Sequence, residues 1–202
     1  MYKTGHYNDV TREQMISFAE LHSFAIITGT GNEYPVATQL PMEITEESGK
    51  IILSGHIMRN TDHHRAFEKN PNVLVIFSSP HAYVSAEWYA NPLVGSTVNY
   101  MSVHMKGQII FKDEQGTEEA VRKITEKHIG KESPASFDKL PKEYISRMVN
   151  AIAGFRIETE SMEAVFKLSQ DHDARDRENI IAQLEKRRLP GDIFIAGEMK
   201  AL

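Results

Sequence analysis

The chain has 202 residues, of which 41% are hydrophobic, so it is long enough to bury one substantial core, and we expect a single domain over residues 1–202. It contains no Cys, which excludes disulfides, thiolate zinc sites and a Cys nucleophile. The formal net charge is -5, and the basic residues are scattered apart from KRR at 186–188. The chain therefore lacks the basic surface that is usual in DNA-binding domains. A dimer could still form a local basic patch.

The N-terminal half contains short elements separated by turn residues. Thr11 followed by Gln14 is a capping-box pattern, and it predicts a helix within 11–22. A second short helix is expected within 59–71 and should end before Pro71, because the residue before proline avoids the helical conformation. The strands expected in this half span 23–28, 35–42, 50–56 and 73–78.

The C-terminal half opens with the longest strand candidate, VNYMSVHMKGQIIF at 98–111. Its apolar residues at 101, 103 and 105 alternate with polar ones at 100, 102 and 104. Acidic starts and Gly or Pro signals predict helices over 117–130 and 141–149, so a helical insertion is expected at about 113–150. Two further strands, AIAGFRIETE and AVFKLS, should precede a C-terminal helix at about 171–190.

The order of these elements indicates the fold class. About six or seven strands come in runs rather than in strict alternation with helices, which favours an α+β fold around an antiparallel β-barrel with peripheral helices. A doubly wound parallel sheet is the weaker alternative. The N-terminus lacks the apolar segment of a signal peptide, and no stretch approaches the roughly 18 apolar residues that span a bilayer, so we expect a cytoplasmic protein with no membrane partner.

Several familiar kinds of catalytic or binding site have no signature in this sequence. HExxH and comparable His spacings are absent, so no metal site is expected although several histidines lie near the strands. GxSxG, GxxxxGK[ST] and GxGxxG are absent too, which argues against a serine hydrolase and against the common nucleotide-binding loops. A phosphate ligand would therefore need another kind of site.

One polar group could provide that site. Arg59 and His63 follow the strand that carries Ser54 and His56, close to a predicted helix start, and Arg offers a fixed fork of donors to phosphate oxygens. The alternative is a solvated loop with a surface Arg. Further along, SSPHAYVSAEWY at 78–89 gathers hydroxyls, aromatic rings and an imidazole, which suits either a binding wall or a dimer core without ligand.

Four long segments carry a resemblance to a known family. They are HIMRNTDHHR, SSPHAYVSAEWY, VNYMSVHMKGQIIF and AIAGFRIETESMEAVFKLSQD, and in this order they resemble the PaiB-type FMN-binding transcriptional regulators of the flavin split-barrel superfamily. The resemblance implies a split β-barrel homodimer with FMN held between the barrel edges of two subunits. SSPHAYVSAEWY would then wall the flavin site or line the dimer seam.

The resemblance also assigns roles to residues. His56, Arg59 and His63 match the family's HxxRxxxH pattern and, with Ser54, would hold the phosphate and ribityl end. Residues matching the central motifs would lie beside the flavin ring or at the seam: Tyr83, Ser85, Trp88, Asn99, Tyr100 and His104. The last group matches KLSQ and would reach the cofactor from the neighbouring subunit: Lys167, Ser169 and Gln170.

The chain also departs from the family pattern. The family commonly has Asn-Pro where this chain has Thr61 and Asp62, and Trp where it has His64 and Val98. After KLSQ the family has Asn-Arg, whereas this chain has Asp171 and His172.

Three functions follow as hypotheses. The first is an FMN-binding homodimer that regulates transcription, with redox or flavin sensing as a further role. The family resemblance suggests DNA as its partner, whereas the net charge does not support one. The second is an FMN-dependent oxidoreductase acting on a small molecule. The third is a haem-binding split barrel with His as axial ligand.

Overall fold

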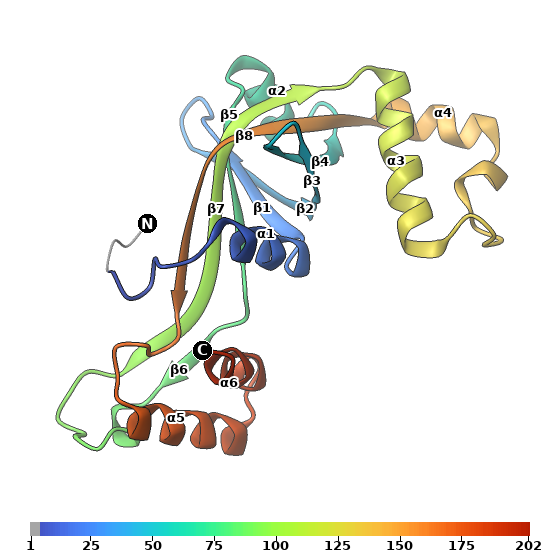
Figure 1. The fold of residues 1–202 in the computed structure, drawn as a ribbon. Coiled ribbons are helices and arrows are strands. Elements are labelled where there is room, and N and C mark those ends of the chain that lie inside the picture. Colours follow the sequence, from blue (N-terminus) through green and yellow to red (C-terminus); the bar gives the residue numbers. More distant parts are fainter. Residues whose placement is uncertain (1–4) are drawn as a thin grey trace. The chain divides into compact units, whose positions relative to one another are not determined.

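The computed structural model describes residues 5–202 as an α+β fold with one large antiparallel sheet (Figure 1). Its strands are β1 (Phe24–Gly29), β2 (Val36–Pro41), β3 (Glu43–Glu47), β4 (Lys50–Met58), β5 (Asn72–Ser78), β6 (Ala82–Val84), β7 (Thr97–Phe111) and β8 (Ile152–Lys167). Its α-helices are α1 (Arg12–Leu21), α2 (Asp62–Lys69), α3 (Glu114–Ile129), α4 (Lys142–Ala151), α5 (Ala174–Arg187) and α6 (Asp192–Lys200). Two short 3-10 helices complete the described elements, η1 (Ala86–Trp88) and η2 (Phe137–Lys139).

The strand order confirms the predicted fold class. The sheet runs β2-β1-β5-β7-β8-β4-β3, and β6 pairs with β7 outside this path. The pairs β1–β2, β1–β5, β3–β4, β4–β8 and β6–β7 are all antiparallel, which rules out the doubly wound parallel alternative. The sheet has eight strands where six or seven were predicted.

The chain divides into two compact units, which are described separately. The first combines the N-terminal residues up to Phe18 with Phe77–His104 and Glu163–Leu202. The second consists of Ala19–Ile76 and Met105–Met162. Strands β7 and β8 contribute residues to both units.

In the second unit, a sheet built from β1 to β5 and parts of β7 and β8 carries α2. Side chains such as Ile27, Leu53 and Phe155 are fully buried in its core. Helix α2 places Phe67 against Gly29 of β1, where a Cβ would lie 2.7 Å from the Phe67 ring. Gly29 therefore allows the close approach of the second half of α2 to β1.

The segment between β7 and β8 is helical, as the sequence indicates. Helix α3 begins at its N-cap Asp113, whose side chain accepts a hydrogen bond from the Gly116 N–H, and ends at Gly130, which has a positive φ of 75°. Val121 of α3, Phe137 of η2 and Ile152 form a small buried cluster that joins the helices to the start of β8.

In the first unit, the N-terminal segment packs along β8 and the C-terminal helices pack near β6. The Phe166 N–H donates to the Tyr7 carbonyl at 2.9 Å, and the Phe18 and Phe166 rings lie 5.1 Å apart. Helix α1 has the predicted capping box, because the Thr11 N–H donates to Gln14 Oε1 at 2.8 Å and the Gln14 N–H donates to Thr11 Oγ1 at 3.2 Å.

Three details differ from the sequence-based expectation. The two strands predicted after residue 150 are one continuous strand, β8. Strands β3 and β6 were not predicted, and the C-terminal helix α5 is followed by a second helix, α6, that the sequence patterns did not indicate.

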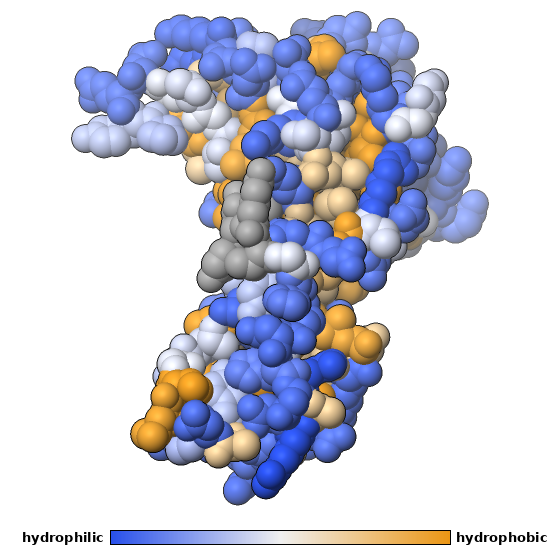
Figure 2. Space-filling model, turned by 60° about the vertical axis from the view of Figure 1, so that its left-hand side comes forward, coloured by the Kyte–Doolittle hydropathy of each residue, from blue (hydrophilic) through white to orange (hydrophobic). Residues whose placement is uncertain are grey.

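Several large apolar side chains are exposed in the described part of the chain, among them Leu21, Phe24 and Leu93. The face shown in Figure 2 is mainly hydrophilic, with hydrophobic side chains in small separate groups. Within residues 5–202, no helix combines the length and the apolar character needed to cross a lipid bilayer.

Candidate functional site

The predicted site residues form two groups, one in each unit. Ser54, His56, Arg59 and His63 belong to β4, α2 and the turn that joins them, in the second unit. The other nine belong to β6, η1, β7, the end of β8 and the loops beside them, in the first unit: Tyr83, Ser85, Trp88, Asn99, Tyr100, His104, Lys167, Ser169 and Gln170.

On β4, Ser54 and His56 share one face. Both are half-buried and alternate with the buried Leu53, Gly55 and Ile57, as the two-residue period of a strand requires. The His56 Nδ1 atom is buried and has no hydrogen-bond partner within residues 5–202. Burial lowers the pKa of His56, so its imidazole is neutral at neutral pH and offers one N–H donor and one acceptor.

Arg59 begins the turn that leads from β4 into α2. Its backbone N–H donates to the Ala151 carbonyl at 2.9 Å, and the next residue, Asn60, has a positive φ of 63° that reverses the chain. In the described part of the chain, the Arg59 guanidinium forms no hydrogen bond or ion pair. Burial is the main cause of the lowered pKa of His64, and the charge of Arg59 lowers it further.

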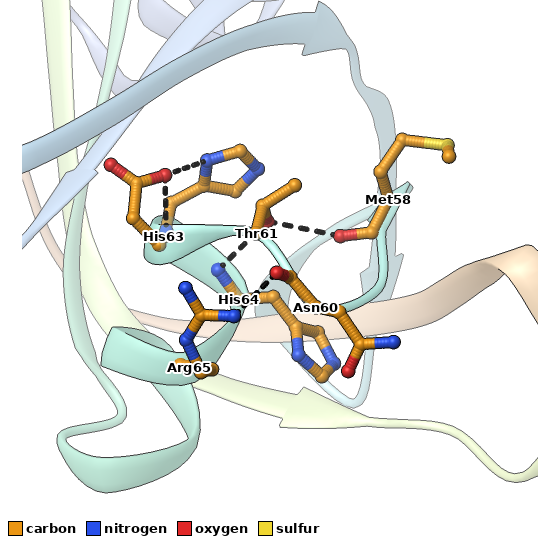
Figure 3. A network of polar contacts seen from close by, with 7 residues as sticks. Met58, Asn60, Thr61, His63, His64 and Arg65 are labelled. Atoms are coloured by element: carbon orange, nitrogen blue, oxygen red, sulfur yellow. Dashed lines mark hydrogen bonds and ion pairs between the residues drawn. The ribbon is translucent and has the colours of Figure 1, made fainter.

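Thr61 fixes the first turn of α2 (Figure 3). Its hydroxyl donates to the Met58 carbonyl at 3.0 Å and accepts from the His64 N–H at 3.2 Å, so the N-cap links the helix to the end of β4. The Arg65 guanidinium donates to the Asn60 carbonyl at 2.5 Å, which stabilises the same turn.

Asp62 is the first residue of α2 and contacts His63 twice. Its Oδ1 atom accepts from the His63 N–H at 2.8 Å and lies 3.1 Å from His63 Nδ1 (Figure 3). These hydrogen bonds lower the pKa of Asp62, chiefly the one from the backbone. His63 is therefore already held by a carboxylate, whereas His56 and Arg59 are not.

In the first unit, part of the predicted site is an internal polar contact. Asn99 and Ser169 are fully buried, with Asn99 Nδ2 2.9 Å and Asn99 Oδ1 3.2 Å from Ser169 Oγ. Gln170 accepts from the Leu168 N–H at 2.7 Å and donates to the Phe166 carbonyl at 2.5 Å. The contact between Asn99 and Ser169 joins β7 to the residues after β8, and Gln170 holds the C-terminal end of β8.

Lys167 and the two β7 residues complete this group. The Lys167 ammonium donates to the Thr97 hydroxyl and lies 5.7 Å from the centre of the Tyr7 ring. Tyr100 and His104 are half-buried on the face of β7 opposite the buried Met101 and Val103, as the alternation predicts. Ser102 departs from it, because its side chain is buried and donates to the Phe77 carbonyl at 3.0 Å.

The aromatic stretch at 82–89 is held by the C-terminal helices. The Arg187 guanidinium donates to the Tyr83 carbonyl at 2.8 Å and lies 4.9 Å from the Trp88 ring centre. Asn179 of α5 donates to the Trp88 carbonyl at 2.5 Å, and Ser85 accepts from the Glu87 N–H at 3.3 Å to cap η1. Figure 1 shows β6 beside α5 and α6.

Two further contacts, which sequence reasoning missed, fix this arrangement. Asp192 at the start of α6 is 1% exposed and accepts from Arg187 at 2.6 and 2.9 Å. The Tyr89 ring stacks on His172, with centres 4.5 Å apart and planes 11° apart. The KRR run at 186–188, which includes Arg187, is the one sequence signal for these contacts.

No metal site is apparent among the described residues, because no three His, Asp or Glu side chains are grouped as metal ligands within 5–202.

With this geometry described, comparison with known proteins identifies the family. Residues 1–161 match the family model described as "Putative FMN-binding domain". The chain belongs to this FMN-binding family. It is also 33% identical to the protease synthase and sporulation protein PAI 2 of Bacillus subtilis, over 94% of this chain and 92% of that protein.

Solved structures agree on the fold. The chain is similar to the flavocytochrome Anf3 from Azotobacter vinelandii, with a TM-score of 0.63, 16% identity and coverage of 88% of this chain and 78% of that one. It is also similar to the FAD and heme binding protein from Mycobacterium smegmatis, with a TM-score of 0.61, 16% identity and coverage of 92% and 82%. The predicted family, its flavin cofactor FMN and the split-barrel fold are thus confirmed.

Proposed function

We propose that this protein holds FMN by its phosphate at the turn between β4 and α2, through Arg59, His56 and Ser54. The observation that carries the proposal is that the Arg59 guanidinium has no partner within residues 5–202, while the nearby strand offers a buried, unpartnered nitrogen on His56. Buried polar groups without partners are uncommon in native proteins, and they mark places where a ligand can bind.

The chemistry of these groups suits a phosphate monoester. The FMN phosphate carries a charge of about -1.5 to -2 at neutral pH. Arg presents two parallel N–H donors to such an oxyanion, and a neutral His contributes one more donor without adding charge. Bound flavin would supply electron and hydride transfer, whereas this chain's residues bind and orient it.

We further infer that the protein acts as a homodimeric, FMN-dependent regulator of gene expression. The inference is supported by the similarity to PAI 2 of Bacillus subtilis, whose name connects it with protease synthesis and sporulation. The net charge of -5 does not favour DNA, so regulation would require a local basic surface or a protein partner.

FMN titration followed by flavin fluorescence tests the cofactor proposal. The change Arg59→Ala should weaken FMN binding about 10-fold to 150-fold, because hydrogen bonds to charged groups contribute about 1.5 to 3 kcal/mol. Lys69→Ala is the matched control, since it removes the same charge from an exposed position in the last turn of α2, away from the turn that carries Arg59. Equal effects of the two changes would contradict the assignment of Arg59.

A second experiment tests the regulator proposal. Sedimentation of the FMN-loaded protein should give a dimer, and binding to promoter DNA should depend on sequence and weaken as salt rises. A dimer that binds no DNA at any salt concentration, yet is reduced by a nicotinamide cofactor with turnover of an acceptor, would favour the oxidoreductase alternative. A Soret band in the purified protein would favour the haem alternative.

A further inference from the structure

A surface cavity of about 640 Å³ lies beside the turn between β1 and β2. Its walls come from residues 28–35, from the start of β5 and from the middle of β7 and β8, all of them in the second unit. This volume is within the range of about 300 to 1,000 Å³ that is usual for small-molecule sites. The described residues that line the cavity include none of those predicted to hold FMN.

Closely packed main chain fixes the shape of these walls. Three of the lining residues are glycines, at 29, 31 and 107, and a Cβ added at these positions would lie 2.7, 2.1 and 2.2 Å from a neighbouring atom. For Gly31 this atom is the Tyr34 carbonyl oxygen, and for Gly107 it is the Glu158 carbonyl oxygen. Walls of this kind are formed before a ligand enters, which reduces the entropic cost of binding.

Several polar side chains of the lining are available to a ligand. Thr28 and Thr30 contribute hydroxyl groups, Asn32 and Asn72 contribute carboxamides, and Glu160 contributes a carboxylate. In the part of the chain that the structure describes, none of these five side chains takes part in a hydrogen bond or an ion pair. Together they can donate hydrogen bonds to the hydroxyl groups of a ligand and accept hydrogen bonds from them.

The charged and aromatic residues of the lining narrow the class of ligand. Glu33 and Glu160 carry two negative charges against the one positive charge of Lys106, so the cavity disfavours a phosphate or another anion. The Tyr34 side chain also lines the cavity and is 79% exposed, so its ring is accessible to a planar ligand. Carboxylates bind ribose hydroxyl groups in dinucleotide sites, and Glu160 can bind a pair of hydroxyls in the same way.

We propose that this cavity binds an uncharged ligand with neighbouring hydroxyl groups on a ring, such as the ribose of a nucleoside or a free monosaccharide. Glu160 accepts hydrogen bonds from the hydroxyl groups, and the carboxamides of Asn32 and Asn72 bind the remaining polar atoms. The Tyr34 ring stacks on the base or on the apolar face of the sugar. This site does not depend on the proposed FMN site.

Isothermal titration calorimetry with three compounds tests the ligand class. Adenosine and methyl riboside carry the neighbouring hydroxyl groups, whereas dideoxyadenosine keeps the base and lacks both hydroxyls. We expect adenosine to bind saturably and dideoxyadenosine to bind at least about tenfold more weakly, because it loses two hydrogen bonds. Methyl riboside that binds as tightly as adenosine would identify a free sugar as the source of the hydroxyls, and weaker binding would identify a nucleoside.

Two substitutions show whether binding occurs in this cavity. Glu160→Gln should weaken adenosine binding about fivefold to tenfold, because a charged acceptor becomes neutral. Tyr34→Ala should weaken it at least about fivefold, because stacking on an aromatic ring is lost. The matched controls lie outside the cavity lining, and they are Glu119→Gln at an exposed carboxylate of α3 and Tyr144→Ala at a ring of α4 that is 48% exposed.

Both control variants should keep the affinity for adenosine within about twofold of the wild-type value. Thermal unfolding of all four variants checks that each retains the fold. The proposal would be overturned if none of the three compounds bound saturably at concentrations up to about 10 mM. Equal affinities for adenosine and dideoxyadenosine, or equal losses in the cavity variants and their controls, would overturn it as well.

Discussion

The pair formed by Arg187 and Asp192 should be a main stabilising contact of the first unit. The Asp192 carboxylate is buried and accepts from Arg187 at 2.6 and 2.9 Å and from the Leu189 N–H at 2.8 Å. The same guanidinium donates to the Tyr83 carbonyl and covers the Trp88 ring, so one cation connects α5, α6 and the β6 to η1 segment. The change Asp192→Asn keeps the size of the side chain and removes its charge.

The expected magnitude follows from these contacts. Each hydrogen bond to a charged group contributes about 1.5 to 3 kcal/mol, but Arg187 is 24% exposed and water would replace part of what it loses. Asn also retains one acceptor oxygen. We therefore expect the free energy of unfolding to fall by about 2 to 3 kcal/mol, which corresponds to a Tm lower by about 4 to 12 °C for a chain of this size.

Trp88 makes this change easy to follow. It is the only Trp in the chain and lies under the Arg187 guanidinium, so its fluorescence reports on this contact during urea unfolding. The control is Glu185→Gln, which breaks the exposed ion pair between Glu185 of α5 and Lys200 of α6. This change should lower the free energy of unfolding by less than about 1 kcal/mol. Equal losses for the two variants would refute the reasoning.

The pH dependence gives a second check on the same pair. Hydrogen bonds from Arg187 lower the pKa of Asp192, so the unfolded state binds this proton at a higher pH than the folded state. The contribution of Asp192 to stability is present above its unfolded pKa of about 3.9 and is lost as the pH falls through the folded value. The Asp192→Asn variant should lack this part of the acid destabilisation.

Two other predictions concern the stability of the protein: one tests packing at two glycines, and the other tests the protonation of three histidines. Gly107→Ala should lower the free energy of unfolding by about 1 to 3 kcal/mol, because the added Cβ would lie 2.2 Å from the Glu158 carbonyl oxygen. Gly95→Ala, where the added Cβ meets nothing within 4 Å, should leave it nearly unchanged. Similar urea midpoints for the two variants would contradict this reasoning. Burial lowers the pKa of three histidines, His22, His56 and His64. As the pH falls below about 6.5, these histidines are protonated in the unfolded state before they are protonated in the folded state, so the free energy of unfolding should decrease. Equal stability at about pH 8 and about pH 5.5 would be inconsistent with this account.

Local sequence signals predicted the elements that they determine. The capping box at Thr11 and Gln14 forms both of its hydrogen bonds, and the alternation along 98–111 matches the burial pattern of β7 except at the buried Ser102. Both signals depend on residues close in sequence, where backbone geometry alone fixes which side chains meet.

The sequence patterns did not predict, or wrongly split, the elements that form through contacts with residues distant in the sequence. The polar residues at 158–161 interrupt the hydrophobic pattern of β8, yet the strand continues through them as one element. Strand β3 is rich in Glu, which disfavours strands, and it forms because Ile44 pairs with Leu53 of β4. Helix α6 has a largely apolar sequence rather than a clear amphipathic period, so only its packing on α5 defines it.

In the candidate site too, residues close in sequence could be proposed together, whereas contacts between distant residues could not be predicted. Ser54, His56 and Arg59 could be proposed as one site from the sequence because they lie within six residues on β4 and the turn that follows it. The hydrogen bond from Arg187 to the Tyr83 carbonyl joins residues about 100 positions apart, so no local sequence pattern indicates it. Asp62 was noted only as a departure from the family pattern, because the charge that it places at the start of α2 becomes apparent from its contacts with His63.

The most direct test of the FMN site compares FMN with riboflavin in equilibrium titrations of the wild-type protein and the Arg59→Ala variant. The account predicts that the wild-type protein binds FMN more tightly than riboflavin and that Arg59→Ala removes this preference while riboflavin affinity stays within about twofold. Equal affinities of the wild-type protein for the two flavins, or a preference for FMN that survives the loss of Arg59, would contradict it.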